Sequence, residues 1–316
     1  MNSYDVIIIG GGAGGLTAGI YTSREILSTL LIEKKITGGL AAKTELIENY
    51  PGFPEGITGM DLMDKMRNQA QKFGVNIAEF EEVILVKPTA GNEIIVRTVK
   101  EEKYRVEYRA YSVIVASGTV PKLLNIPGEK EFRGKGISYC ATCDGPLYKD
   151  KDVAVIGCGD SGLQEGESLL KHAKSVTFVA FSPHMVGSKI YQKRIRRNKK
   201  ANFLLNHALI RIDGDEFVDS ITVKDRNNGQ ERKIEVSGVF IYKGFLPATD
   251  FLKEAKIELD KGEYIKTNDQ METSVPGIYA VGDIRSKMVR QIDVACGEAT
   301  VAATAASHRI QALKSS

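Results

Sequence analysis

The stretch that decides the fold occurs twice in this sequence. Residues 5–16 read DVIIIGGGAGGL, and residues 152–163, 147 positions further along the chain, read DVAVIGCGDSGL. In each copy an apolar β-type run precedes the pattern G-x-G-x-x-G and a stretch of helical character, and a second apolar run follows at 30–32 or 176–179. Each copy therefore predicts a βαβ unit, and the two units together predict two nucleotide sites.

The glycines of this pattern have mechanical roles in dinucleotide binding. The first permits a tight turn, the second lets the backbone approach a pyrophosphate, and the third lets helix and strand pack closely. The N-terminus of the following helix offers unpaired N–H groups to the phosphates. A single G-x-G-x-x-G is a weak signal, because glycine-rich turns after strands are common, but two matching copies are strong. The predicted loops are Gly10, Gly12, Ala13, Gly14 and Gly15 in the first copy, and Gly157, Gly159, Asp160, Ser161 and Gly162 in the second.

Length and composition fit a globular protein of two domains. The 316 residues correspond to two domains of roughly 150 residues. A hydrophobic share of 42% and a charged share of 26% argue against long disordered segments. The net charge of +3 predicts no nucleic-acid partner. The apolar run at 6–9 breaks into glycines and is too short for a secretory or membrane segment, so we expect a cytoplasmic protein with no membrane partner.

The order of the motifs predicts one domain inserted into another. Residues 81–108 alternate apolar and charged residues like an antiparallel meander, and the apolar run at 277–283 ends in glycine and acid. That late run has no partner within the inserted domain, so we assign it to the first. The predicted fold is α/β, with two Rossmann-like dinucleotide-binding domains. Residues 1–118 and 246–316 form the first, and residues 119–245 form the second, which carries the C-x-x-C motif.

Glu33 indicates what the first loop binds. It follows Gly10 by 23 residues, at the end of the second apolar run, where a carboxylate can accept both ribose hydroxyls of an adenosine moiety. A surface acid at a strand end is the less specific alternative. The dinucleotide is NAD or FAD, and Asp283 favours FAD, because ribitol and a second phosphate need further polar contacts at neighbouring strand ends.

Several short motifs resemble the low-molecular-weight thioredoxin reductases of bacteria and archaea along nearly the whole chain. They are GGL at 38–40, ENYPGF at 48–53, CATCDG at 140–145, GDIR at 282–285 and RQ at 290–291. The resemblance implies a homodimer in which electrons pass from a nucleotide to FAD, then to the dithiol and to thioredoxin. It also implies an FAD site that includes Glu33, Gly38, Gly39, Leu40, Asn49, Gly118, Gly282, Asp283, Arg290, Gln291 and Ile292. Leu40 stands where the family usually has Gln, so we expect one flavin hydrogen bond to be missing.

The pair Cys140 and Cys143 is the predicted redox centre. A C-x-x-C pair at the start of a helix holds two sulfurs within bonding reach and favours the thiolate that performs exchange chemistry. Half of a zinc site is the main alternative, but zinc needs four ligands and the sequence has no second C-x-x-C, so we expect no metal. The resemblance assigns Asp144 as general acid and base, although an acid at a helix start is also common. It further implies that Cys143 faces the flavin and Cys140 attacks the substrate disulfide.

The second nucleotide loop lacks the expected recognition residues. Ala180 stands at the position equivalent to Glu33, where NADH recognition needs an acid. NADPH-using relatives carry His-Arg-Arg and a further Arg, where this chain has 180–182 and Val186. Three interpretations are open: weak binding of NADH or NADPH with compensation by nearby basic residues (Lys189, Lys193, Arg194), a carrier such as ferredoxin or a deazaflavin, or an unknown donor. The intact glycine loop favours a pyridine nucleotide.

The leading hypothesis is therefore an enzyme, an FAD-dependent thioredoxin-disulfide reductase. A reductase of a peroxiredoxin system shares all these motifs, and a non-enzymatic FAD-binding redox sensor is a rival of another class. Residues 189–200 contain seven basic side chains, which indicate either a solvated helix face or a docking face for an acidic protein such as thioredoxin or ferredoxin.

Overall fold

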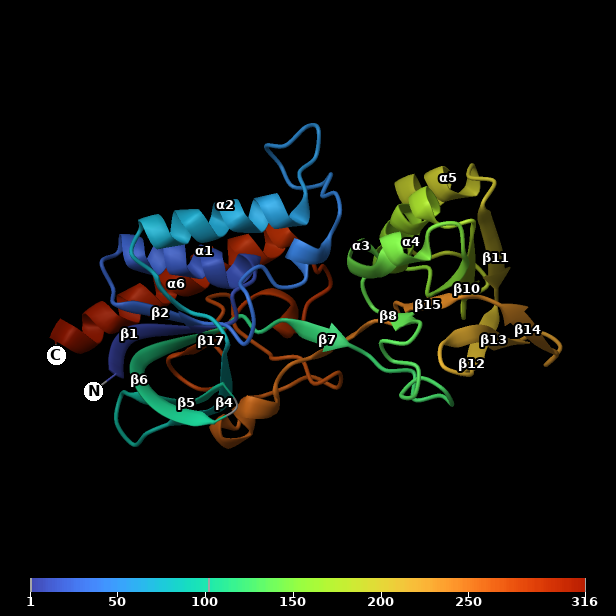
Figure 1. Ribbon diagram of the computed structural model, residues 1–316. Coiled ribbons are helices and arrows are strands. Elements are labelled where there is room, and N and C mark those ends of the chain that lie inside the picture. The colour runs from blue at the N-terminus through green and yellow to red at the C-terminus, as the bar shows by residue number, and fades with distance from the viewer. Residues whose placement is uncertain (1, 102, 316) are drawn as a thin grey trace. The chain divides into compact units, whose positions relative to one another are not determined.

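The computed structural model describes residues 2–101 and 103–315, which form two compact units (Figure 1). The first unit ends at Val120 and resumes at Leu246, and the second spans Pro121–Phe245. Each unit contains a βαβ element on a sheet with parallel strands, so the predicted α/β class is confirmed. None of the helices described is both long and apolar enough to cross a membrane.

The first unit is built on a seven-stranded sheet in the order β3-β2-β1-β6-β5-β4, with β17 also pairing with β6. The pairs among β1, β2, β3, β6 and β17 are parallel, whereas β4, β5 and β6 form an antiparallel meander. The strands are β1 (Asn2–Ile9), β2 (Thr29–Ile32), β3 (Asn76–Ala78), β4 (Glu81–Pro88), β5 (Ile94–Lys100), β6 (Tyr104–Val115) and β17 (Ile278–Ala280).

Three helices cover one face of this sheet: α1 (Ala13–Arg24), α2 (Gly59–Lys72) and α6 (Ile292–Ser315). Side chains alternate across a strand, so Ile8 of β1 packs toward these helices and Ile7 packs on the opposite face. Leu16 of α1 lies fully buried in the helical layer, which contributes about 2 kcal/mol of hydrophobic stabilisation. On the opposite face, the side chains of β1, β2 and β6 share a core with those of β4 and β5, the last two strands of the same sheet, and with the short helix η3 (Asp250–Ala255). Two further turns, η1 (Ala41–Lys43) and η4 (Gly282–Ile284), lie in loops.

The second unit has a five-stranded parallel sheet in the order β11-β10-β9-β15-β8 and a separate antiparallel sheet in the order β12-β13-β14. The parallel strands are β8 (Ile137–Ser138), β9 (Asp152–Ile156), β10 (Ser175–Ala180), β11 (Ala201–Leu205) and β15 (Gly238–Ile241). The antiparallel strands are β12 (His207–Gly214), β13 (Val218–Asp225) and β14 (Glu231–Glu235). The helices are α3 (Ala141–Asp144), η2 (Gly145–Tyr148), α4 (Asp160–His172) and α5 (Lys189–Arg196).

Close packing of α4 on the second sheet depends on Gly166. A Cβ atom there would lie 2.2 Å from the ring of Phe178, which is fully buried on β10. The Phe178 ring also stacks on Phe203 of β11, with 5.5 Å between ring centroids. These contacts set the distance between α4 and the strands. They therefore also set the positions of the side chains at the N-terminal end of α4.

The two segments that connect the units pair with each other. They are β7 (Thr119–Pro121) and β16 (Phe245–Pro247). The Lys122 N–H donates to Gly244 O at 2.9 Å, and the Ala248 N–H donates to Gly118 O at 3.2 Å. The chain therefore leaves and re-enters the first unit along adjacent strands.

Candidate active site

The predicted FAD residues of the first unit follow strands that end at one edge of the sheet. Because β1, β2, β6 and β17 run in parallel, the residues that follow them gather at their common carboxyl edge. These residues are Gly10 after β1, Glu33 after β2, Gly118 after β6, and Gly282 with Asp283 after β17. Ligands of open parallel sheets bind at this edge.

The two glycine loops have nearly the same geometry. Gly10 and Gly157 have φ values of +107° and +112°, which only glycine adopts at little cost. A Cβ on Gly15 would lie 1.9 Å from Gly10 O, and one on Gly162 would lie 2.0 Å from Gly157 O. The middle glycines, Gly12 and Gly159, have no atom within 4 Å of such a Cβ. In both loops, therefore, the outer glycines close the turn and the middle glycine leaves open space beside the backbone. Ala13 and Gly14 begin α1, and Asp160 and Ser161 begin α4.

Glu33 already interacts with the first loop. Its carboxylate accepts the N–H of Gly11 at 2.7 Å and the N–H of Lys35 at 2.9 Å. Both bonds hold the carboxylate at the end of β2, next to the turn where a dinucleotide's ribose is expected. The position of Glu33 thus fits the predicted ribose contact.

In both units the segment after the second strand of the βαβ element, β2 or β10, returns to the glycine loop. The Gly38 N–H donates to Gly11 O at 2.8 Å, and in the second unit the N–H groups of Val186 and Gly187 donate to Cys158 O at 3.0 Å. Gly39 has φ of +59° and lies against Gly12. The internal repeat therefore extends beyond the glycine loop, and the predicted residues Gly38 and Gly39 belong to it.

Two predicted residues far apart in the sequence meet through a hydrogen bond. The side-chain amide of Asn49 donates to Gln291 Oε1 at 2.9 Å, across 242 positions of sequence. Leu40, the residue after Gly39, is exposed. The residue after Gln291, Ile292, begins α6.

A buried group of charges surrounds the end of β17. The Gly282 N–H donates to the buried carboxylate of Glu298 at 2.8 Å, and Lys287 lies 3.1 Å from the same carboxylate. Burial raises the pKa of Asp283, while the charges of Lys287 and Arg290 oppose this shift. The Arg290 guanidinium also lies 4.1 Å from the centroid of the Tyr264 ring. Glu298, which fixes the backbone before Asp283, was not among the predicted residues.

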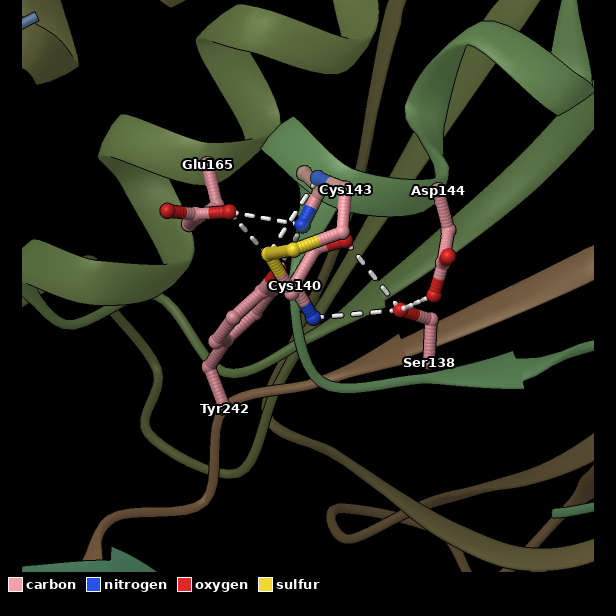
Figure 2. Close-up of a disulfide and its surroundings, with 7 residues drawn as sticks. Ser138, Cys140, Cys143, Asp144, Glu165 and Tyr242 are labelled. Carbon is pink, nitrogen blue, oxygen red and sulfur yellow. Dashed lines mark hydrogen bonds between the residues drawn. A yellow bond between two sulfur atoms is a disulfide. The ribbon is translucent and has the colours of Figure 1, made fainter. Parts of the chain in front are cut away.

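The dithiol occurs as a disulfide at the carboxyl edge of the second sheet (Figure 2). Cys140 follows β8 and caps the short helix α3, and its Sγ accepts the Cys143 N–H at 3.2 Å. The second glycine loop follows β9 at the same edge, because β8, β15 and β9 are parallel. The edge thus brings together the disulfide and the second dinucleotide loop.

Asp144 is held by Ser138, which no sequence motif marks. The Ser138 hydroxyl lies 2.6 Å from Asp144 Oδ2 and accepts the Cys140 N–H at 3.1 Å. The negative charge of Asp144 also adds to burial in raising the pKa of Tyr148. A carboxylate on the residue that follows the second cysteine of the pair, and held in one orientation, is suited to proton transfer.

Two further groups contact the dithiol segment on its other side. The Ala141 N–H donates to Glu165 Oε2 at 2.7 Å and to the Tyr242 hydroxyl at 3.1 Å. Glu165 comes from α4 and Tyr242 directly follows β15, so neither is near the cysteines in sequence. No motif marks them, and only the topology of the sheet and α4 brings them to Ala141.

Ala180 ends β10, and its side chain is buried in the core, so it offers no polar group to a ligand. The neighbouring Phe181 is exposed, and the Arg226 guanidinium stacks on its ring at 3.6 Å and donates to Phe181 O at 2.9 Å. The Asp160 carboxylate accepts the N–H of Ser188 at 2.7 Å.

The basic run at 189–200 is largely exposed, but some of its cations have partners. Arg194 lies 3.6 Å from Glu167, and Lys200 donates to Ala173 O at 2.9 Å. Arg196 stacks over Phe203. The remaining lysines that the sequence suggested for nucleotide binding, Lys189 and Lys193, are exposed.

Cys158 and Cys296 are free cysteines outside the dithiol. Burial raises the pKa of both thiols, that of Cys158 to about 12. Within residues 2–101 and 103–315, no group of three or more His, Cys, Asp or Glu side chains is placed to hold a metal ion.

Comparison with known proteins gives the class to which this site belongs. A family model described as pyridine nucleotide-disulphide oxidoreductase matches residues 4–299. The chain belongs to this family. It is 44% identical over 314 residues to a thioredoxin reductase of Bacillus subtilis (strain 168), covering 98% of this chain and 96% of the relative.

Two solved structures agree with the fold and the relationship. The thioredoxin reductase of Lactococcus lactis, described as in the FR conformation, matches with a TM-score of 0.93 at 36% identity. The T. acidophilum thioredoxin reductase matches with a TM-score of 0.92 at 37% identity. Each match covers 98% of this chain and 99% of the other. The resemblance that the short motifs indicated is confirmed.

Proposed function

We propose that this chain is a thioredoxin-disulfide reductase. It transfers electrons from NADH or NADPH, with FAD as cofactor, through the Cys140/Cys143 dithiol to a thioredoxin disulfide. The observation that carries the proposal is the Cys140–Cys143 disulfide, at the edge of the sheet that also holds the second glycine loop. Family membership supports FAD and a pyridine nucleotide, and the similarity to thioredoxin reductases supports thioredoxin as the acceptor.

FAD fits the residues at the carboxyl edge of the first sheet. The open space at Gly12 admits a pyrophosphate, and Glu33 stands where an adenosine ribose binds. The further FAD residues that we propose are Ala13, Gly14, Gly38, Gly39, Leu40, Asn49, Gly118, Gly282, Asp283, Arg290, Gln291 and Ile292. When bound, FAD supplies a two-electron carrier between a pyridine nucleotide and a disulfide.

The donor nucleotide is proposed to bind the second loop, formed by Gly157, Gly159, Asp160, Ser161 and Gly162. The open space at Gly159 supports this site. Ala180 supplies no acceptor for the ribose, and one such bond to a charged group contributes about 1.5–3 kcal/mol. We therefore expect affinity lower by about one to two decades than with a carboxylate at this position.

The exchange itself requires only this chain's dithiol and the acceptor disulfide. The Cys140 thiolate attacks one sulfur of the acceptor, the acceptor S–S bond breaks, and the other sulfur leaves as a thiolate that is protonated, with Asp144 as the proton donor. Asp144, left as a carboxylate, then takes the proton of Cys143, and the Cys143 thiolate attacks Cys140 Sγ in the mixed disulfide. This step re-forms the Cys140–Cys143 bond and releases the second acceptor sulfur, so one disulfide is reduced as one is oxidised.

Anaerobic titration of the holoprotein tests the donor. NADPH, NADH and reduced ferredoxin are added in parallel while the visible flavin absorption is followed. Bleaching by either nucleotide supports the proposal. Bleaching by ferredoxin alone contradicts the nucleotide assignment and favours the ferredoxin-dependent alternative.

Substitution of Cys143 by Ser tests the reductase against a redox sensor. The Cys143→Ser protein is expected to keep FAD and to lose all thioredoxin reduction, whereas Cys296→Ser keeps both, because Cys296 is outside the dithiol. Thioredoxin reduction that persists in Cys143→Ser contradicts the proposal. Comparing thioredoxin with a peroxiredoxin-system protein as acceptor separates the two reductase alternatives.

The homodimer and the cytoplasmic location that the sequence predicts stay predictions. Light scattering of the purified holoprotein measures the first, and fractionation of cells that express the full chain measures the second.

A further inference from the structure

The amide of Ala141, between the two cysteines, is bound by two side chains from different elements. It donates to Glu165 Oε2 at 2.7 Å and to the Tyr242 hydroxyl at 3.1 Å, and that hydroxyl lies 3.3 Å from Glu165 Oε2. Figure 2 shows Glu165 and Tyr242 on one side of the disulfide and Ser138 and Asp144 on the other. The dithiol segment is thus flanked by two carboxylates, and the proposed exchange uses only one of them.

The Glu165 carboxylate is held in place by its surroundings. Helix α4, which carries it, packs against α3, and the backbone N–H of Tyr242 donates to Ile156 O at 2.7 Å. Burial, with the charge of Glu165 as a further cause, raises the pKa of the Tyr242 phenol. Tyr242 therefore stays protonated at every physiological pH and remains available to donate to Glu165.

The titratable groups around the dithiol come from all the elements packed on it. Of the other acids on α4, Asp160 accepts from Ser188 and Glu167 pairs with Arg194, so both are engaged by other elements. Tyr139 precedes Cys140 in the sequence. Its hydroxyl donates to Glu129, and Arg133 lies over its ring. The groups that face the dithiol segment itself are Asp144 of α3, Glu165 of α4 and Tyr242 after β15, and the charge of Asp144 also acts on Tyr148 of η2.

We infer that Glu165 is a positioning residue of the dithiol, which holds the Ala141 amide and places a negative charge beside Cys140 that destabilises the Cys140 thiolate. This inference rests on the proposed disulfide exchange and deepens it. A like charge within a few ångströms disfavours ionisation of a thiol. In this arrangement Asp144 transfers the proton, while Glu165 determines how readily Cys140 ionises and how nucleophilic its thiolate is.

Such an arrangement suits a reductase. Dithiol proteins whose reduced form is stabilised are oxidants, so a carboxylate that opposes the Cys140 thiolate makes the pair more reducing. A thiolate of higher pKa is also the better nucleophile once it forms, with a Brønsted coefficient of about 0.4–0.5. Glu165 therefore lowers the fraction of Cys140 that is ionised and raises the reactivity of each thiolate that forms.

The test is the pH profile of Cys140 alkylation in the FAD-loaded protein. A Cys143→Ser background leaves Cys140 as the only thiol of the motif, and iodoacetamide labelling is followed by peptide mass spectrometry from pH 6 to 10. Glu165→Gln keeps an oxygen that can accept from Ala141 but removes the charge. We expect its profile midpoint to fall by about one pH unit. The rate then rises about threefold below both midpoints and falls about threefold on the high-pH plateau.

Two further variants separate charge from structure. Glu167→Gln removes a charge from the same helix, but Glu167 pairs with Arg194, so its profile is expected to coincide with that of the background protein. Tyr242→Phe removes a donor to Glu165 and leaves the carboxylate less neutralised. We expect its midpoint to move the opposite way, to higher pH.

A Glu165→Gln profile with an unchanged midpoint overturns the inference, since a merely structural contact alters stability without moving the titration of Cys140. An equal shift in Glu167→Gln also overturns it, because the effect would then be general to the charge of α4. If Glu165→Gln does not fold, Tyr242→Phe decides, and an unmoved midpoint there rejects the inference. Alkylation needs neither nucleotide nor thioredoxin, so failure of the proposed function is detected separately, by the absence of thioredoxin reduction in the wild-type protein.

Discussion

The hydroxyl of Ser138 lies 2.6 Å from the carboxylate of Asp144, and the same oxygen accepts the N–H of Cys140 at 3.1 Å. One buried side chain thus connects the backbone of the first cysteine to the acid that follows the second. Because Ser138 ends β8, the orientation of Asp144 is set by the sheet as well as by the short helix that carries it. Proton transfer depends on this orientation if Asp144 is the acid and base of the exchange.

Replacement of Ser138 by Ala removes this connection. General acid–base catalysis contributes a factor of about 10²–10⁴, so partial loss of orientation is expected to lower kcat for thioredoxin reduction about tenfold. The lost hydrogen bonds lower the free energy of unfolding by about 1–2 kcal/mol. Steady-state kinetics and chemical denaturation measure the two effects. Ser112→Ala is the matched control, because Ser112 is fully buried and its hydroxyl has no hydrogen-bond partner among the described residues, and a comparable loss of kcat there would contradict the role of Ser138.

Two glycine substitutions in the first glycine loop are expected to have different effects, one on folding stability and the other on FAD affinity. Gly15→Ala brings a Cβ to 1.9 Å from Gly10 O, so we expect a loss of about 3 kcal/mol or more in folding stability. Gly12→Ala has space and an ordinary extended backbone, so the protein folds, but the methyl group occupies the approach of the pyrophosphate. FAD affinity is expected to fall at least about tenfold. Thermal denaturation and the FAD content per chain measure these outcomes, and full FAD retention in Gly12→Ala would refute this placement of the cofactor.

Glu33 provides a second test of the FAD site. Glu33→Gln weakens the proposed ribose contact, a hydrogen bond to a charged group that is worth about 1.5–3 kcal/mol. Titration of the apoprotein with FAD is expected to give a dissociation constant about 10- to 100-fold higher than that of the wild type. Glu82→Gln, an exposed acid on β4 paired with Lys34, serves as the control. Equal affinities for FAD in all three proteins would exclude the ribose contact.

The buried thiol of Cys158 is expected to lower the folding stability of the protein at alkaline pH. Burial raises the pKa of its thiol to about 12, above the value of about 8.5 in an unfolded chain. The folded state therefore holds its proton more tightly, and the contribution to stability is complete below pH 8.5 and declines as the pH rises toward 12. The limiting slope is about 1.4 kcal/mol per pH unit. Denaturation of wild type and Cys158→Ala at pH 7 to 10 isolates this term, and parallel curves would contradict it.

Cysteine labelling gives an independent check of the same burial. Iodoacetamide at pH 8 is expected to modify Cys158 only after denaturation, whereas reduced Cys143, which is exposed, reacts in the native protein. Mass spectrometry of peptides identifies the modified sites. Rapid native labelling of Cys158 would show that its environment opens.

The features that sequence predicted well are those encoded by contiguous residues. The glycine spacing of 10–15 and 157–162 determines local backbone geometry, so both loops follow from the pattern alone. The pair Cys140 and Cys143 is likewise local. The repeat also located Ala180, because a constant offset carries one known position onto another.

The features that sequence did not reveal arise from topology. Ser138, Glu165 and Tyr242 come from a strand, a helix and a strand end that converge on the dithiol segment 140–144, because β8, β15 and β9 are parallel neighbours. A single Glu on a helix or Tyr after a strand has no periodicity or spacing that distinguishes it from surface residues. Glu298, which receives the Gly282 amide from 16 positions away, was missed for the same reason.

The paired crossing strands make the second unit separable. Gly118 and Ala248 are joined by a hydrogen bond of 3.2 Å at the border of the first unit, and Lys122 and Gly244 by one of 2.9 Å at the border of the second. Both cut ends of either unit therefore lie side by side, so a short turn can close the first unit and the second can be transplanted with its two termini together. In this architecture the unit at Pro121–Phe245 can be exchanged while the core of the first unit stays intact.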